Sequence, residues 1–188
     1  SASASYHALN SLIEKGIFSV FKDEISRLDH FEKEDLISYD LSPAQKQAFS
    51  QIKTNFEEKD VVLLHGVTSS GKTEIYIKLI REAIDKGYQV LYLLPEIALT
   101  TQIINRLRKH FGDLVGVYHS KFNNNERAEI WNEVQNSGRF PVILGTRSSI
   151  FLPFSNLGLI IVDEEHENTF KQQQPSPRYN ARDTVIKY

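Results

Sequence analysis

The sequence contains no cysteine and no methionine. The absence of cysteine excludes disulfide bonds, cysteine-ligated zinc and thiol catalysis within these 188 residues. No apolar run approaches the about 20 residues that a membrane-spanning helix needs, and residues 1–5 lack the basic and apolar regions of a signal peptide. With a net charge of −2, the chain has no overall field that attracts a polyanion, so a contact with nucleic acid must come from a local patch.

The missing methionine also bears on domain organisation. A natural reading frame begins with methionine, and residues 182–188 contain no glycine or proline that would end a helix. We therefore expect the chain to be a piece of a longer protein, with a few added residues at its front. Residues 1–40 are expected to hold those residues, a remnant of a preceding module and a linker, with a solvated arm as the alternative reading. Residues 41–188 are expected to form one domain.

From residue 41 onward, apolar runs of strand length alternate with segments of helix length. The first helix is marked by Ser42 and Pro43, an N-cap residue followed by proline in the first turn. Strands that alternate with helices form parallel sheets covered on both faces. The sequence thus predicts an α/β fold with a parallel β-sheet and helices on both faces. The expected strands are the apolar runs at 61–64, 90–94, 114–118, 142–144 and 159–162.

A phosphate-binding motif follows the first apolar run. Residues 66–73 read GVTSSGKT, which matches G-x-x-x-x-G-K-T between a strand and a helix. Its glycines allow backbone N–H groups to wrap a phosphate at the positive end of the helix, while Lys72 reaches the β- and γ-phosphates and the Thr73 hydroxyl ligates Mg²⁺. The alternative is a chance glycine turn with a surface lysine. The predicted nucleotide-binding residues are Gly66, Thr68, Ser69, Ser70, Gly71, Lys72 and Thr73.

Acidic residues follow the last apolar run, at the edge where ligands of open parallel sheets bind. Asp163 is predicted to hold magnesium together with Thr73, and Glu164 to orient or deprotonate the attacking water. Lys72, Asp163 and Glu164 thus form the predicted catalytic set. The alternative is a helix N-terminus enriched in acids. The six histidines show no convincing metal-ligand spacing, and only its place after this motif singles out His166.

These motifs, in this order, resemble the superfamily-two DExH helicases, and among them the bacterial replication-restart helicases. The resemblance extends from about residue 41 to the end. It implies the first of two RecA-like P-loop NTPase lobes, with the end of a winged-helix domain at 8–16. It is carried by the segments GVTSSGKTE (66–74), LPEIALT (94–100), YHS (118–120), GTRSSIF (145–151), DEEHE (163–167), KQQ (171–173) and RYNARD (178–183).

The resemblance also implies a function for the longer protein. That protein is expected to be an ATP-dependent 3′-to-5′ DNA helicase that restarts stalled replication forks and assembles the primosome. The implied cofactors are ATP and magnesium, with zinc bound only by a part of the protein outside this chain. The implied partners are forked and single-stranded DNA, single-strand-binding protein and primosome proteins, with no membrane. The expected state is a cytoplasmic, nucleoid-associated monomer.

Two loops and the segment after the acidic motif are assigned to DNA by the same resemblance. Amides, hydroxyls and a few cations suffice to grip a nucleic-acid backbone without reading sequence. Residue chemistry alone leaves helix capping equally open for the loops at 100–101 and 146–148. A basic cluster at 106–110 is interpreted as a solvated face. The residues expected to contact DNA or couple it to ATP are Thr100, Thr146, Arg147, Ser148, His166, Phe170, Lys171, Arg178 and Tyr179.

The sequence departs from the family pattern at Pro177, where an aromatic residue is usual, and at Asn180, where His or Ser is common. Phe170 and Tyr179 remain to stack on bases. Gln45 is expected to read the adenine base, as the glutamine before the P-loop does in related helicases, although it could equally be an exposed helix residue.

Because hydrolysis in this class also uses arginines from the second lobe, the chain alone is expected to bind nucleotide weakly, with little or no ATPase activity and no unwinding. Two other functions stay open at this stage. One is a P-loop NTPase that acts on protein or small molecules, and the other is a non-catalytic docking fragment.

Overall fold

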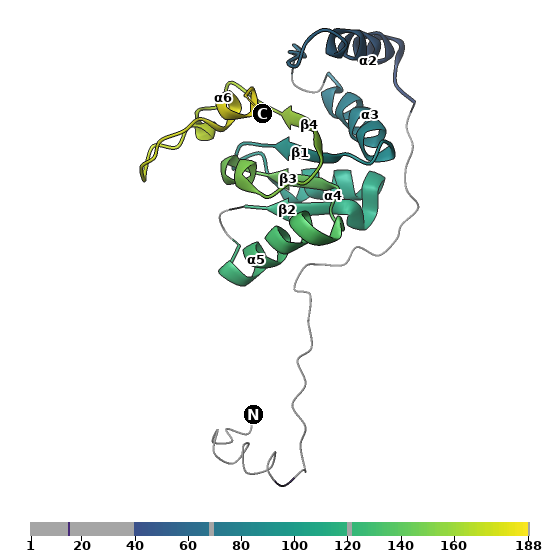
Figure 1. Cartoon of the computed structure of the whole chain (residues 1–188). Helices are drawn as coiled ribbons and strands as arrows, with labels where there is room; N and C mark the ends of the chain where they lie inside the picture. Colours follow the sequence, from purple (N-terminus) through teal and green to yellow (C-terminus); the bar gives the residue numbers. More distant parts are fainter. Residues whose placement is uncertain (1–14, 16–39, 68–69, 120–121, 188) are drawn as a thin grey trace.

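The computed structural model describes residues 15, 40–67, 70–119 and 122–187 of the chain (Figure 1). The prediction that residues 1–40 hold a remnant of a preceding module and a linker falls almost entirely on residues outside this part. Among the described residues, no helix is long and apolar enough to cross a membrane.

The described domain is built on a sheet of four parallel strands. These are β1 (Gln89–Leu93), β2 (Val115–Tyr118), β3 (Val142–Gly145) and β4 (Leu157–Val162), in the spatial order β2-β3-β1-β4. In Figure 1 their arrowheads point toward the yellow C-terminal segment. Leu93 is in register with both Gly145 and Val162, so the carboxyl ends of three strands coincide. The loops that follow these strands therefore start at one edge of the sheet, as the sequence predicts.

Helices cover both faces of this sheet, which confirms the predicted fold class. The helices are α2 (Pro43–Phe56), α3 (Lys72–Asp85), α4 (Thr101–Phe111), α5 (Asn124–Asn132) and α6 (Ala181–Val185). A π-helical turn at Glu133–Ser137 extends α5, and 3₁₀ turns lie at Gly112–Leu114, Arg147–Phe151 and Asn168–Phe170. The first helix begins as predicted, since Ser42 and Gln45 form a capping box at its N-terminus.

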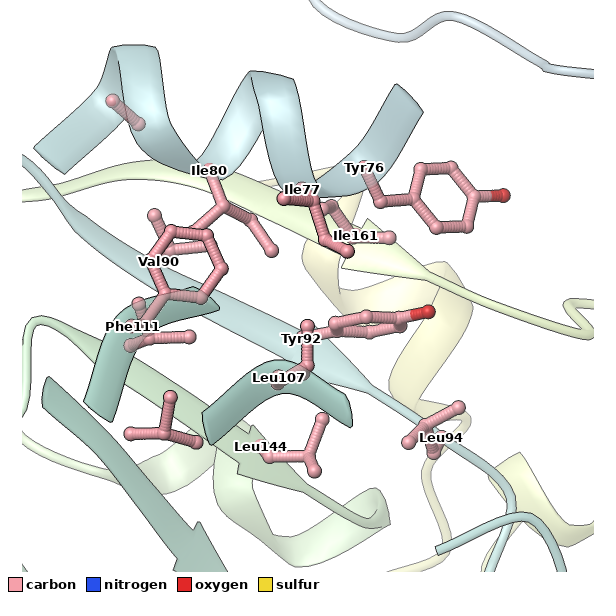
Figure 2. Close-up of a cluster of buried hydrophobic side chains, with 13 residues drawn as sticks. Tyr76, Ile77, Ile80, Val90, Tyr92, Leu94, Leu107, Phe111, Leu144 and Ile161 are labelled. Carbon is pink, nitrogen blue, oxygen red and sulfur yellow. The ribbon is translucent and has the colours of Figure 1, made fainter. Parts of the chain in front are cut away.

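The two faces of the sheet bury two separate apolar clusters. Helices α3 and α4 pack on one face through side chains such as Ile80 and Leu107, and Figure 2 shows this cluster. Helices α5 and α6 pack on the other face, where Ile130 lies in the second cluster. Successive residues of β1 alternate between the clusters, because neighbouring side chains of a strand point to opposite faces. Tyr92 consequently faces α3 from the middle of the sheet.

One predicted strand is absent from the sheet. Residues 61–65 belong to no helix or strand and pair with no strand in the described part of the chain, and Val61 and Leu63 are 52% and 71% exposed. The expectation of five strands is therefore corrected to four. Consecutive apolar residues favour an extended conformation, but a strand also needs a neighbouring strand with free hydrogen-bonding groups, and periodicity does not reveal whether one is available.

Candidate nucleotide and nucleic-acid site

The phosphate-binding motif lies at the start of α3, as the sequence predicts, whereas the run before the motif is not a strand of the sheet. Gly71 is the N-cap residue, with a φ of 81°, and a Cβ atom there would clash with Nε2 of Gln45. Only glycine meets both conditions without strain. The ammonium group of Lys72 folds back over the loop and donates a hydrogen bond to the carbonyl oxygen of Gly66 at 2.7 Å. Thr68 and Ser69 lie outside the described residues.

Gln45 packs against this loop, and its amide group is engaged at both ends. Its Oε1 accepts a hydrogen bond from the backbone N–H of Ser42 at 2.8 Å, while its Nε2 donates to the carbonyl oxygen of Gly71 at 3.1 Å. The side chain thus links the start of α2 to the phosphate loop. Reading an adenine base would require it to exchange at least one of these bonds, so that role stays a prediction.

Asp163 occupies the position directly after β4, and its carboxylate is held at both oxygens. Its backbone N–H donates to the carbonyl oxygen of Leu93 at 3.0 Å, which extends the sheet by one residue. The hydroxyl of Tyr92 donates to Oδ2 at 2.9 Å, and the backbone N–H of Glu164 donates to Oδ1 at 3.1 Å. Sequence reasoning missed Tyr92, because no motif marks a tyrosine in the middle of an apolar strand.

Glu164 has a φ of 52°, and no other non-glycine residue in the described part of the chain has a positive φ. For an L-residue this left-handed conformation costs about 1–2 kcal/mol. Strain of this kind persists only where the surroundings impose it, and it is frequent in functional sites. The backbone geometry thus singles out the residue that the sequence predicts to position water.

The acidic motif lies beside the phosphate-loop helix, and its charges affect the pKa values of two buried tyrosines. Burial raises the pKa of Tyr76, and the charges of Asp163, Glu164 and Glu165 raise it further. Burial also raises the pKa of Tyr92, with the Asp163 charge as the next cause. Both hydroxyl groups point toward the carboxyl end of β1 in Figure 2. Because Tyr76 lies one turn after Lys72 on α3, the structure brings the lysine and the acidic motif to the same edge of the sheet.

His166 follows the acidic motif and is exposed. Its Nε2 lies 3.7 Å from a carboxylate oxygen of Glu164, and its Nδ1 lies 3.8 Å from one of Glu165. It can pair with either carboxylate when protonated.

The donors at this edge suit magnesium. A hydroxyl and a carboxylate are hard oxygen ligands, and proteins commonly bind Mg²⁺ through one or two carboxylates plus the phosphates of a nucleotide. The described residues contain no group of three or more His, Cys, Asp or Glu side chains that could hold a metal alone. The oxygen donors of Thr73 and Asp163 are of the kind that binds magnesium together with a nucleotide, and their role as its ligands stays a prediction.

A cavity of 520 Å³ lies beyond the acidic motif, and we call it the basic cavity. Three of its lining side chains are cationic, and the described residues contribute no carboxylate to it. Positive charge is thus gathered locally in a chain of net charge −2, which meets the condition set above for contact with a polyanion. The lining residues are Arg147, Lys171, Gln172, Gln173, Gln174 and Arg178.

Arg147 joins the end of β3 to the segment that forms this cavity. Its Nη1 donates to the carbonyl oxygens of Thr169 and Lys171 at 3.1 and 3.2 Å. Its Nε is buried and has no hydrogen-bond partner in the described part of the chain. Neighbouring Thr146 is only 2% exposed, so its side chain is not available at the surface, whereas Thr100 is exposed and makes no side-chain cap. Arg147 therefore positions the loop as well as lining the cavity.

The expectation that Phe170 stacks on bases is corrected by the structure. Phe170 is 1% exposed and lies within the second apolar cluster, so its ring cannot reach a ligand in solution. Phe151 is 53% exposed instead, and its ring centroid lies 4.9 Å from that of Tyr179 in an edge-to-face arrangement. Sequence reasoning passed over Phe151, since a single aromatic residue in a turn carries no periodic signal for burial.

The departures from the family pattern fall in the loop that forms the basic cavity. The side chain of Gln172 donates to the carbonyl oxygens of Pro175 and Pro177 at 2.9 and 3.1 Å. Asn180 pairs with Lys171 in an antiparallel bridge and caps α6 by accepting from the N–H of Arg182. Pro177 and Asn180 are thus both part of the hydrogen bonding that shapes the loop.

Comparison with known proteins agrees with this geometry. The family model described as DEAD/DEAH box helicase matches residues 42–184, and the chain belongs to that family. Its fold is that of a RecA-like P-loop NTPase lobe. Part of the LlaGI restriction-modification enzyme shares this fold, with a TM-score of 0.54 and 21% identity over 70% of this chain and 16% of that one. Membership of a helicase family implies ATP as a ligand and magnesium with it.

Within the family, the chain is similar to the replication restart proteins PriA. It is 43% identical to PriA of Synechocystis sp. and 40% identical to PriA of Bacillus subtilis, over 95% of this chain in each case. The chain spans about a fifth of the length of these relatives, 21% and 22% respectively.

Proposed function

We propose that the chain is the ATP-binding lobe of an ATP-dependent 3′-to-5′ DNA helicase that acts in replication restart. The observation that carries this proposal is the position of Asp163, which follows β4 beside the first turns of the phosphate-loop helix. In P-loop NTPases, this pairing of a phosphate loop and a strand-end carboxylate holds a magnesium nucleotide.

Each side chain in this site has a separate part in the proposed chemistry. Lys72 binds the β- and γ-phosphates, and Thr73 and Asp163 hold the magnesium ion. When bound, that ion neutralises charge on the phosphate oxygens. Glu164 orients the attacking water and accepts its proton. The nucleotide displaces the Lys72 ammonium from the carbonyl oxygen of Gly66, where it lies at 2.7 Å.

Catalysis by this lobe alone is proposed to be weak or absent. Charge on the transferring phosphoryl group must be stabilised by preorganised cations, and the resemblance places the required arginines in a second lobe. The lobe is therefore proposed to bind nucleotide weakly and to unwind no DNA by itself.

Single-stranded or forked DNA is the proposed partner of the surface beyond the acidic motif. The basic cavity supplies cations for a phosphate backbone. The Phe151–Tyr179 pair supplies an exposed aromatic ring, and Tyr179 directly follows Arg178 of the cavity. Stacking of a base on an aromatic side chain contributes about 1–3 kcal/mol and tolerates any sequence. These features favour a nucleic-acid substrate over protein or small molecules.

The remaining proposals concern the longer protein. We propose that residues 1–40 include the end of a winged-helix domain and that 41–188 form the first helicase lobe. Zinc, single-strand-binding protein and primosome proteins are proposed to bind parts of that protein outside this chain. The longer protein is proposed to act as a cytoplasmic monomer.

Binding of a labelled single-stranded oligonucleotide tests the DNA proposal. The double variant Lys171→Ala/Arg178→Ala is expected to bind roughly tenfold more weakly. The slope of log affinity against log salt concentration should decrease in magnitude by about 1.4, because each phosphate contact to a single strand contributes about 0.7 to that slope. Fluorescence anisotropy at several salt concentrations measures both quantities.

The control is Lys86→Ala/Lys109→Ala, which changes the net charge by the same amount at exposed positions on α4 and just after α3. Equal losses in the two double variants would mean that only overall charge matters. No binding by the unmodified chain would favour an NTPase that acts on other substrates.

A further inference from the structure

Tyr92 lies between the apolar core and the carboxylate that the proposed function assigns to magnesium. It is the residue next to the carboxyl end of β1 and is fully buried, with 0% exposure. Its hydroxyl is nevertheless not an unpaired polar group in the core, because it donates to Oδ2 of Asp163 at 2.9 Å. Through this hydrogen bond, the position of the Asp163 carboxylate at the sheet edge depends on the position of β1.

The tyrosine ring is itself held in place. It packs edge-to-face against Tyr76 of α3, with centroids 5.7 Å apart and an interplanar angle of 79°. Figure 2 shows the hydroxyl groups of both rings on the same side. Lys72 is the first residue of α3. The contact between the two rings therefore links the phosphate-loop helix, through Tyr92, to Asp163.

Two hydrogen bonds leave the Asp163 carboxylate free to bind a metal. Tyr92 occupies one site on Oδ2, and the N–H of Glu164 occupies one site on Oδ1 at 3.1 Å. A carboxylate offers about four acceptor sites, so about two stay available. Donors that hold the two oxygens from different sides restrict rotation of the group, and a ligand held in advance binds a metal more tightly than one that must be ordered.

We propose that Tyr92 is a positioning residue, whose hydroxyl orients Asp163 for magnesium bound together with nucleotide. This inference rests on the proposed function. It adds to that function a residue of β1 that touches neither nucleotide nor metal and acts through Asp163. Tyr76 contributes packing to this arrangement but no hydrogen bond to Asp163 among the described contacts.

The test measures how much magnesium tightens the binding of ADP. Calorimetric titration of ADP, in saturating Mg²⁺ and in EDTA, yields the ratio of the two affinities. Tyr92→Phe keeps the ring and removes the hydroxyl, and it is expected to lower this ratio by about three- to tenfold, the value of one hydrogen bond. Its affinity for ADP in EDTA should not change, because Asp163 then has no metal to bind.

Tyr76→Phe is the matched control, since it removes a hydroxyl from the other ring of the same pair. Its ratio is expected to equal that of the unmodified chain. Thermal unfolding of both variants shows whether each is folded at the temperature of the titration. A merely structural role for Tyr92 would lower the affinity for ADP with and without Mg²⁺ alike, and that result would overturn the proposal.

Asp163→Asn separates failure of this inference from failure of the proposed function. If this variant loses the effect of Mg²⁺ while Tyr92→Phe retains it in full, Tyr92 does not position the carboxylate and only the further inference fails. If Mg²⁺ has no effect on the unmodified chain, the proposed metal site fails, and the assignment of Tyr92 fails with it.

Discussion

Replacing Lys72 with alanine is expected to weaken the binding of Mg-ADP strongly. In this structure the Lys72 ammonium already lies against the loop that would wrap the phosphates, 2.7 Å from the carbonyl oxygen of Gly66. A hydrogen bond to a charged group contributes about 1.5–3 kcal/mol, so its loss weakens binding by roughly 10- to 150-fold. Calorimetric titration of Mg-ADP measures this loss.

Lys78→Ala provides the control for that experiment. Lys78 lies on the same helix, α3, but is six residues further from the loop. Its replacement removes the same charge and is expected to change the affinity for Mg-ADP less than twofold. Similar losses in both variants would show that α3 attracts nucleotide through charge alone, which contradicts a phosphate loop.

Replacing Phe170 with alanine is expected to destabilise the fold rather than to impair DNA binding selectively. The ring is 1% exposed among the apolar residues that pack on the second face of the sheet. Phe→Ala substitutions in cores cost about 3–5 kcal/mol through lost burial and the remaining cavity. Urea denaturation followed by circular dichroism should therefore show a decrease of this size in the free energy of unfolding.

Phe151→Ala is the contrasting variant. Phe151 is 53% exposed, so its loss is expected to change the free energy of unfolding by less than about 1 kcal/mol and to weaken binding of single-stranded DNA instead. The account of these two aromatic residues is wrong if Phe170→Ala leaves stability unchanged and lowers DNA affinity.

The nucleotide site and the basic cavity share one short stretch of chain. The acidic motif ends at Glu165, and the segment that lines the cavity begins at Lys171. Arg147 binds this stretch from β3, and the guanidinium group of Arg182 donates to the carbonyl oxygen of Glu165 at 3.3 Å. A ligand that moves the loop around the cavity would therefore act on the backbone next to Glu164.

The sequence was sufficient to predict the parts of the site that depend on local geometry. A phosphate loop needs Gly71 in the left-handed region directly before a helix, and this requirement is written in consecutive residues. Asp163 could be placed for a similar reason, since parallel strands bring their carboxyl ends to one edge of the sheet. Both predictions concern where a residue lies in the fold.

The features that the sequence did not reveal depend on contacts between distant residues. Burial of Phe170 and exposure of Phe151 are decided by which face of the loop packs against the sheet, and both residues are phenylalanine. The hydrogen bond from Tyr92 to Asp163 joins residues 71 positions apart. The run at 61–64 has the composition of a strand, but composition cannot show whether another strand lies beside it.

The most direct test of the account is the effect of Mg²⁺ on the affinity of the chain for ADP, because the central claim is that the phosphate loop and Asp163 form one site. Calorimetric titration is expected to show binding that is roughly tenfold tighter in Mg²⁺ than in EDTA, and Asp163→Asn should remove this difference while the fold is retained. Equal affinities with and without Mg²⁺ in the unmodified chain, or an undiminished effect of Mg²⁺ in Asp163→Asn, would contradict the claim.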